Sequence, residues 1–282
     1  MEQLLIERNI LKKCICDVKE LIVPEGVKKI EEKAFWNDEH GYDMKNVESV
    51  LLPESVANLS KSFSGLRSLK RINVPCSVKK LNSYEFDYCT DLEEVTLTDS
   101  LESIGTLSFH MCTSLKKINI PDSVTNIGKE AFAGCVRLEN IKLSSGIKKI
   151  NESMFDSCSS LESIVIPDGV EIIDKYAFMN CNHLKRIVLP ETITKIGEQA
   201  FGRCNSLIEI ECNEQVFEVL WKSYNDSWLE ERFKHCVRLL KNNKELRDVE
   251  KRYVLRHQQD MIDYFEREGI DLPEILKKGK KE

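Results

Sequence analysis

The sequence lacks any long uninterrupted apolar run. Within the first twenty residues, charged side chains such as Glu7, Arg8 and Lys12 interrupt the apolar bursts, so no stretch is long enough for the core of a signal peptide. No later run approaches the roughly 20 apolar residues that a membrane-spanning helix needs. We therefore expect a cytoplasmic protein that does not interact with a membrane.

Recognisable catalytic and nucleotide-binding motifs are also missing. The chain has no G-x-x-x-x-G-K-[ST], no G-x-G-x-x-G and no C-x-x-C, so phosphate loops and paired-cysteine sites have no sequence support. His235 stands beside Cys236, but adjacent residues of a helix point about 100° apart, which argues against a catalytic pair. We expect no enzymatic activity, no cofactor and no metal site.

Basic residues do not gather into a large patch. The net charge is −6, and the last 70 residues, from Asn213 onward, hold 15 basic and 15 acidic residues, so the acidic excess comes from the region before them. The one basic cluster is a short run at the end of the chain, typical of a solvated terminus: Lys277, Lys278, Lys280 and Lys281. We therefore expect no nucleic-acid partner.

What the sequence does contain is a 23-residue repeat, clearest in residues 122–135, 168–181 and 191–204. Before the proline of each repeat, two apolar residues flank one variable residue, as Ile118 and Ile120 flank Asn119, which predicts a short strand. Strands that stack once per coil form a parallel sheet with a spacing of about 4.8 Å. The proline ends each strand, and a second apolar pair, such as Val124 and Ile127, should face the interior from the opposite wall.

The remainder of each repeat predicts a corner and a closing segment. Six consecutive repeats carry residues that tolerate a positive φ or cap a short helix: Asn82, Gly105, Gly128, Asn151, Asp174 and Gly197. A single helical turn should follow and carry one phenylalanine per coil into an aromatic column: Phe35, Phe63, Phe86, Phe109, Phe132, Phe155, Phe178 and Phe201.

Six of the eleven cysteines occupy one equivalent position per repeat: Cys89, Cys112, Cys135, Cys158, Cys181 and Cys204. Free cysteine packs as a small apolar side chain, so this spacing favours a reduced, buried ladder. Disulfides and a metal site are the alternatives. A zinc site requires ligands that converge tetrahedrally, whereas a ladder sets them in line.

The pattern I-P-x-x-V-x-x-I-G-x-x-A-F-x-x-C-x-x-L, present at residues 120–138, resembles the leucine-rich repeats of the BspA-like type. The resemblance covers residues 18–212, about eight repeats, and implies an α/β repeat solenoid, curved, with a parallel sheet on its concave side. BspA-like proteins are mostly bacterial, often surface-exposed, and associated with adhesion and protein binding. These properties are what the resemblance implies for this chain.

The segments outside the regular repeats have their own patterns. Residues 1–17 predict a β-hairpin cap, because an unsealed first coil would expose its interior and strand edge. Residues 37–44 are an insert, either a plain surface loop or a functional one, and the second repeat is one residue short before Phe63. Residues 213–282 predict a helical tail whose first apolar stripe covers the last coil, with further helices starting at Ser227 and spanning residues 244–268, the latter ended by Gly269.

The variable strand positions form the one surface where the repeats differ while their interiors agree. Alternating charges there, such as Arg71, Glu94 and Lys117, favour either sheet solubility or partner recognition. Val165 and Val188 are predicted exposed apolar neighbours. The predicted partner-binding residues are Arg71, Asn73, Glu94, Thr96, Lys117, Asn119, Lys142, Val165, Arg186 and Val188.

These observations predict a monomeric, non-catalytic scaffold for protein–protein interaction that binds an unidentified protein partner through its concave face. The alternative is a bacterial cell-surface or secreted adhesin that binds host or neighbouring-cell proteins.

Overall fold

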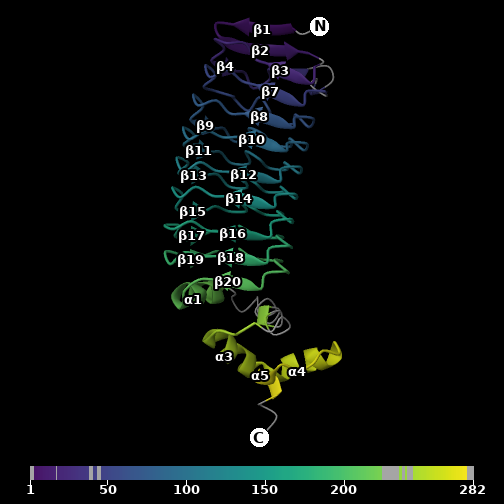
Figure 1. Cartoon of the computed structure of the whole chain (residues 1–282), viewed down its shortest axis with the longest axis vertical. Helices are drawn as coiled ribbons and strands as arrows, with labels where there is room; N and C mark the ends of the chain where they lie inside the picture. The colour runs from purple at the N-terminus through teal and green to yellow at the C-terminus, as the bar shows by residue number, and fades with distance from the viewer. Residues whose placement is uncertain are drawn as a thin grey trace.

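Three-residue strands stack along one wall of an elongated column of coils, with the N-terminus at one end and helices at the other (Figure 1). The computed structural model describes residues 3–16, 18–37, 41–42, 46–223, 235–236, 239 and 244–277. The long strands are β3 (Glu20–Ile22), β7 (Ser49–Leu51), β8 (Arg71–Asn73), β10 (Glu94–Thr96), β12 (Lys117–Asn119), β14 (Asn140–Lys142), β16 (Ser163–Val165), β18 (Arg186–Val188) and β20 (Glu209–Glu211).

The predicted pairing of the long strands is confirmed. They pair in parallel in three groups, β3-β7-β8-β10, β12-β14 and β16-β18-β20, and within each group equivalent residues of successive coils lie opposite each other, as Arg71 and Glu94 do, and Val165 and Val188. The middle residue of each strand points inward and the other two point outward, as the period-2 pattern requires. This is an α/β-class repeat solenoid of about eight turns with a parallel sheet, as the sequence predicted.

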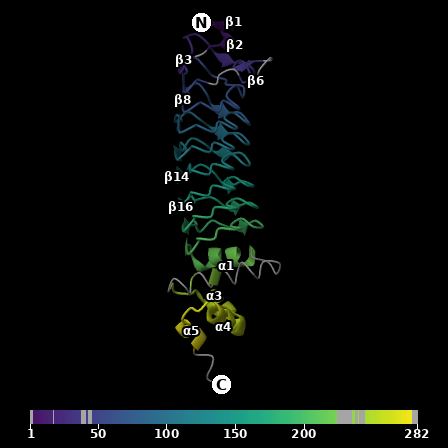
Figure 2. The same cartoon turned by 90° about the vertical axis from the view of Figure 1, so that its right-hand side faces the viewer.

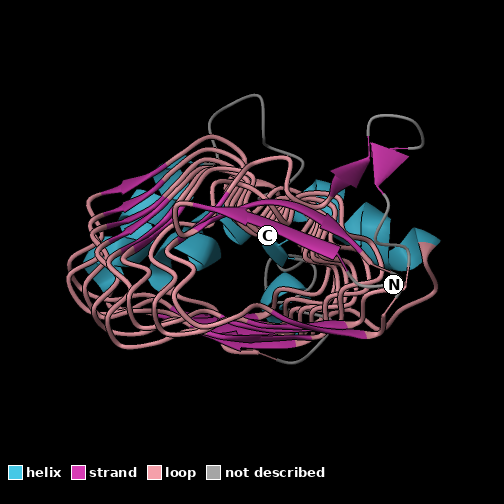
Figure 3. Ribbon diagram, turned by 90° about the horizontal axis from the view of Figure 1, so that it is seen from above, coloured by secondary structure: helices cyan, strands magenta, loops and turns pink. Residues whose placement is uncertain are grey.

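Short parallel strands, which the sequence did not predict, line the opposite wall. They end at the second residue of each apolar pair: β4 (Lys29–Ile30), β9 (Lys80–Leu81), β11 (Ser103–Ile104), β13 (Asn126–Ile127), β15 (Lys149–Ile150), β17 (Ile172–Ile173) and β19 (Lys195–Ile196). Strands β9, β11 and β13 pair in one group, and β15, β17 and β19 in another. Seen from above, the coils superpose and the two walls of strands face each other across the interior (Figure 3).

The third wall of each coil is a run of turns, and the predicted helical turn is absent from the described repeats. Its backbone N–H groups donate to the next coil instead: Tyr84 N–H to Thr106 O at 2.9 Å, and Phe86 N–H to Ser108 O at 2.8 Å. A helix would need acceptors four residues away in the same coil. Because the neighbouring coil provides the acceptors, the segment stays extended between its turns.

The prediction of positive φ at the six corner positions was also wrong. The left-handed residues lie two positions further along the chain, with φ between 49° and 65°: Tyr84, Leu107, Glu130, Ser153, Tyr176 and Gln199. Glycine is required at the predicted corner for another reason: the backbones of neighbouring coils approach each other closely there. A Cβ atom on Gly128 would lie 2.3 Å from the backbone nitrogen of Thr106, so a side chain there would force the two coils apart.

The interior is filled by the predicted apolar columns. One phenylalanine per coil is buried, and neighbouring ring centroids lie 5.2–5.6 Å apart. From Phe86 to Phe201 the rings are nearly parallel, with interplanar angles of 3–18°. The first two pairs are tilted by 40° and 30°. The tilt occurs around Phe63, in the coil that is one residue short.

The six repeat cysteines are buried, and none of the eleven cysteines forms a disulfide. Each ladder thiol donates a hydrogen bond to the carbonyl of the phenylalanine in the preceding coil, at 3.1–3.2 Å, as Cys135 does to Phe109 O. The cysteine therefore fills space and also satisfies a buried acceptor, which alanine could not do.

The predicted hairpin at the N-terminal end is confirmed. Strands β1 (Gln3–Glu7) and β2 (Ile10–Ile15) are antiparallel, and Arg8 and Asn9 have φ of 49° and 64°, as a type I′ turn requires. Strand β2 then pairs in parallel with β4, so the hairpin extends the sheet of short strands.

The insert forms a small hairpin that projects from the column (Figures 2 and 3). It consists of β5 (Trp36–Asn37) and β6 (Gly41–Tyr42), which are antiparallel. Residues 38–40 and 43–45 of the predicted insert region lie outside the described residues.

The C-terminal end is covered by helix α1 (Glu214–Ser223). Its predicted apolar stripe is buried: Val216, Phe217, Leu220 and Trp221. The helix predicted from Ser227 lies mostly outside the described residues. The region predicted as helical from 244 to 268 contains two helices, α3 (Asp248–Arg256) and α4 (Gln258–Arg267), which meet at His257. Gly269, with a φ of +65°, follows α4, and α5 (Glu274–Lys277) comes next.

Candidate protein-binding face

The outward side chains of the long strands form a continuous surface, which we call the strand face. Of the ten predicted partner-binding residues, seven are exposed there: Arg71, Glu94, Thr96, Lys117, Asn119, Lys142 and Val165. Asn73, Arg186 and Val188 are half-buried. Val188 is therefore less accessible than the sequence suggested, whereas Val165 is 58% exposed.

Two of the half-buried residues are already engaged within the fold. The Asn73 side-chain amide donates to Leu52 O and its oxygen accepts from Leu52 N–H, both at 3.2 Å, so Asn73 bridges two coils. The Arg186 guanidinium lies 3.3 Å from a Glu209 carboxylate oxygen and also binds Glu211. These contacts leave both side chains with little freedom to rearrange around a partner.

The most exposed apolar pair lies at the other end of the strand face. Ile22 and Leu51 are opposite each other in β3 and β7, and are 59% and 50% exposed. Ile22 and Leu51 occupy the same variable strand position as Asn73 in the two preceding coils, but the set of partner-binding residues predicted from the sequence includes neither. Leu51 borders a shallow depression of about 210 Å³ that is also lined by Arg71, Asn73 and Glu94.

The charges around this depression are unpaired. Arg71 and Glu94 face each other in register, but within the described residues neither forms an ion pair, and Lys117 forms none. A charged side chain without an internal partner can pair with one from another protein at a lower cost than one that must first break a contact.

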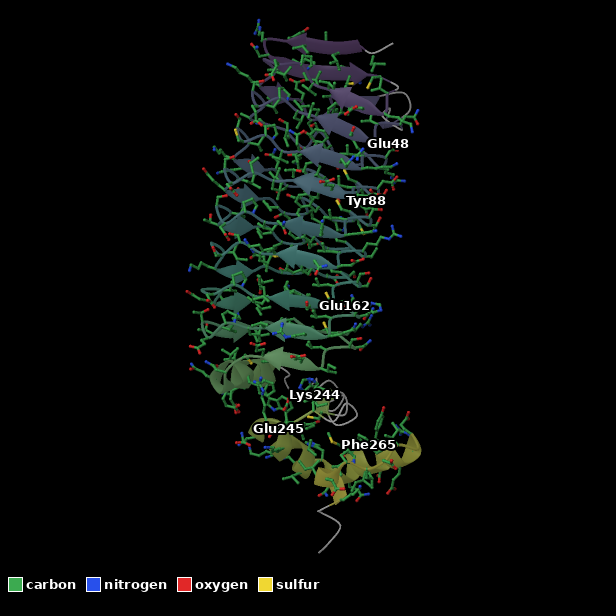
Figure 4. The ribbon with its side chains drawn as sticks, in the orientation of Figure 1. Glu48, Tyr88, Glu162, Lys244, Glu245 and Phe265 are labelled. Carbon is green, nitrogen blue, oxygen red and sulfur yellow. The ribbon has the colours of Figure 1, made fainter. Side chains whose placement is uncertain are left out.

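A separate row of charges, one residue before each strand, forms ion pairs along the edge of the strand face. The Glu48 carboxylate oxygens lie 3.0 Å from Lys70 Nζ and 3.0 Å from Lys19 Nζ. Hydrogen bonds from these two cations lower the pKa of Glu48, and Lys70 has the larger effect. Glu162 pairs with Lys185 at 3.1 Å. Glu48, Tyr88 and Glu162 follow one edge of the column (Figure 4). All these groups are exposed or partly exposed, so the pairs contribute little to stability.

The helical tail contacts the last coil. The Arg247 guanidinium lies over the Phe217 ring, 4.1 Å from its centroid, and donates to Ile210 O and to the Cys212 sulfur. Next to it, His235 Nε2 and Glu250 Oε1 are 2.8 Å apart and both side chains are buried. Lys244 and Glu245 border a small cavity of about 180 Å³ at this junction (Figure 4).

At this junction Cys236 is fully buried, and His235 Nε2 lies 2.8 Å from Glu250 Oε1, beside the small cavity that both His235 and Glu250 border. Within the described part of the chain, no group of three or more His, Cys, Asp or Glu side chains is placed to hold a metal ion, and no helix there is long and apolar enough to cross a membrane.

A family comparison agrees with this architecture. The profile described as "BspA type Leucine rich repeat region (6 copies)" matches residues 5–137 and 107–229. The chain belongs to the BspA-type leucine-rich repeat family. No curated protein matches it significantly.

Solved structures of bacterial leucine-rich repeat proteins share the fold. A leucine-rich repeat protein from Bacteroides ovatus is 24% identical, with a TM-score of 0.58 over 76% of this chain and 63% of that protein. The Treponema pallidum protein TpLRR is 26% identical, with a TM-score of 0.56 over 80% of this chain and 94% of its own. A third, from Eubacterium ventriosum, is 20% identical, with a TM-score of 0.52 over 69% of this chain and 61% of its own. This chain thus spans less than two thirds of the Bacteroides and Eubacterium proteins.

One coil carries a charged residue at an interior position of the repeat. The position before each phenylalanine is small in most coils: Ala34, Ser62, Ser108, Ala131, Ala177 and Ala200. The third coil has Glu85 there, fully buried. Its Oε2 accepts from the Asn82 side chain at 2.8 Å, whereas its Oε1 has no hydrogen-bond partner in the described structure. Burial raises the pKa of Glu85 to about 7, against a smaller lowering by Asn82.

Proposed function

We propose that this chain is a non-catalytic scaffold that binds a protein partner through the strand face. A leucine-rich repeat solenoid is typically such a scaffold, and its interior residues are fixed by packing. The observation that carries the proposal is the pair Ile22 and Leu51, which lies next to a depression lined by the unpaired charges of Arg71 and Glu94. Arginine is among the residue types enriched at the positions that dominate the binding energy of protein interfaces.

This proposal moves the expected centre of binding toward the N-terminal half of the strand face. Val165 is as exposed as Ile22, but its neighbours Val188 and Arg186 are half-buried and engaged. Arg71 needs to break no ion pair before it contacts a partner. The remaining predicted residues, including Thr96, Lys117 and Asn119, extend the same surface and would form its polar rim.

The test compares two variants of the full chain in the capture and affinity measurement of a protein partner. The double variant Ile22→Asp/Leu51→Asp should weaken binding at least tenfold, about 1.4 kcal/mol, because it places two charges in the apolar anchor. Val165→Asp is the matched control, an equally exposed valine on the same face. It should bind within a few-fold of the parent, and both variants should keep the parent's melting temperature.

Two other results would change this view. Loss of binding in Val165→Asp alone would return the anchor to the C-terminal half of the strand face. Unchanged affinity in both variants would remove the strand face as the binding site and leave the projecting β5–β6 hairpin or the helical tail.

We further propose that the protein acts in the cytoplasm, because eleven free cysteines suit a reducing compartment. The competing function is that of a surface adhesin. Cell fractionation distinguishes the two: recovery of the native protein at the cell surface would contradict the cytoplasmic proposal and support the adhesin.

A further inference from the structure

The outer edge of strand β1 is open. β1 pairs with β2 on one side, and it is the outermost strand of the sheet ordered β1-β2-β4. Within the described residues nothing lies beyond it at the N-terminal end of the column (Figure 1). The N–H and C=O groups along that edge therefore lack partners within the fold and can pair with a strand from another chain.

The side chains of β1 also leave apolar surface exposed. Leu5 is 53% exposed and Ile6 is 37% exposed. The opposite end of the solenoid differs, because α1 buries its four apolar residues on the last coil. The C-terminal end of the apolar interior is thus covered by a helix, whereas the N-terminal end is covered by a hairpin with an open strand edge.

Few features protect this edge from pairing. Natural edge strands commonly carry lysine or proline, and Gln3–Glu7 contains neither. The register shift between Leu5 and Ile6 leaves the extra residue, Lys12, on β2 rather than on β1. Glu7 is the one charged side chain of β1.

A second copy of the same chain fits this edge. Two identical strands related by a two-fold axis are necessarily antiparallel, so the pairing closes on itself and makes a dimer rather than a fibre. With the axis at Leu5, the apolar residues Leu4 and Ile6 face each other, and Glu7 falls opposite Gln3. No like charges meet in this register, so the strand is complementary to itself.

We propose that two copies of this chain associate end to end through antiparallel pairing of their β1 strands, with Leu5 at the two-fold axis. The association would bury Leu5 and Ile6 and satisfy the open backbone edge. It would also set two strand faces in one assembly, which raises the avidity for a partner that carries two binding epitopes.

The mass of the intact chain in solution tests this proposal without any partner. Sedimentation equilibrium should give a concentration-dependent mass that approaches twice the 32.6 kDa of one chain. The double variant Leu5→Lys/Ile6→Lys should raise the dimer dissociation constant at least tenfold, because Leu5→Lys places two like charges opposite each other at the two-fold axis and Ile6→Lys adds a charge opposite Leu4. Ile15→Lys is the matched control: Ile15 is 49% exposed but lies on β2, which has no open edge. It should dimerise like the parent.

Hydrogen exchange identifies the surface that associates. Backbone amides of β1 should become more protected as the parent's concentration rises, and those of the Leu5→Lys/Ile6→Lys variant should not. Circular dichroism and melting curves establish that the variants fold.

Three results would overturn the proposal: a parent mass of one chain at the highest soluble concentration, as expected for the monomer that the sequence suggested; a dimer that survives Leu5→Lys/Ile6→Lys unchanged; or a dimer without concentration-dependent protection in β1. None of them bears on the strand face, so the two proposals fail separately.

Discussion

The first two coils, residues 18–66, and the central coils, residues 105–201, are built from the same repeat but packed differently. In the central coils the phenylalanine rings stack within 18° of parallel, and the turn wall is joined coil to coil by regular hydrogen bonds. In the first two coils the rings are tilted by 40°, and the insert hairpin departs from the column. A solenoid transmits order only between neighbours, so one missing residue disturbs two interfaces and leaves the remainder intact.

The largest expected difference between the two regions is the loss of a central ring. Phe132→Ala should lower the free energy of unfolding by about 3–5 kcal/mol, because Phe132 is buried between two parallel rings and its coils cannot collapse into the gap. Phe35→Ala should cost less, since among the described rings of the phenylalanine column Phe35 has one neighbour, Phe63, tilted by 40°. Chemical denaturation of both variants measures the difference. Equal costs would mean that the first coil is as tightly packed as the centre.

A smaller effect is expected at Glu85, just beyond the short coil. Its folded-state pKa of about 7 lies above the ordinary value of 4.5, so the folded protein holds the proton more tightly than the unfolded chain. Glu85 therefore opposes folding increasingly as the pH rises from about 4.5 to about 7, by a few kcal/mol in total, and not further above that range.

The conservative variant Glu85→Gln isolates this contribution. Urea denaturation should show Glu85→Gln to be more stable than the parent at pH 8, and the advantage should disappear at pH 5, where the parent carboxyl is protonated. An advantage that is the same at both pH values would point to packing rather than to ionisation.

The smallest effect concerns the cysteine ladder. Cys135→Ala should cost about 1–2 kcal/mol, because it leaves a small cavity and removes the thiol donor of Phe109 O. Cys76, which is exposed and outside the ladder, is the control, and Cys76→Ala should change stability by less than about 0.5 kcal/mol. Thermal melts of the two variants would contradict the structural role of the ladder if their midpoints were the same.

The regular part of the fold could be read from the sequence because its residues repeat under one constraint. The strand pattern around Asn119, the apolar pair Val124 and Ile127, and the Phe and Cys columns all follow from the need to fill one interior at fixed spacing. The hairpin at Arg8 and Asn9 was also readable, because the apolar bursts on either side predict two strands.

The parts that the sequence did not reveal depend on contacts between coils. The short strands contain two residues each, too few for a periodic signal, and the positive φ values fall on residues as different as Leu107 and Glu130. On the strand face, the register of Arg186 and Glu209 was predictable, but the further contact with Glu211 was not, because it depends on the reach of the arginine side chain. The exposed pair Ile22 and Leu51 would have been found by extending the row of variable strand positions toward the N-terminus.

The hydrogen bonds of the turn wall have a consequence for how such a chain can change in length. The bonds between coils recur with the period of the repeat, as Phe109 N–H donates to Ala131 O and Phe132 N–H to Met154 O, and no described bond of this wall reaches past a neighbouring coil. Duplication or deletion of one whole 23-residue unit in the central coils therefore recreates every junction that it breaks. Genetic events of that size alter the strand face by one strand, about 4.8 Å, without a new folding problem. The length of the strand face can therefore change in steps of one coil.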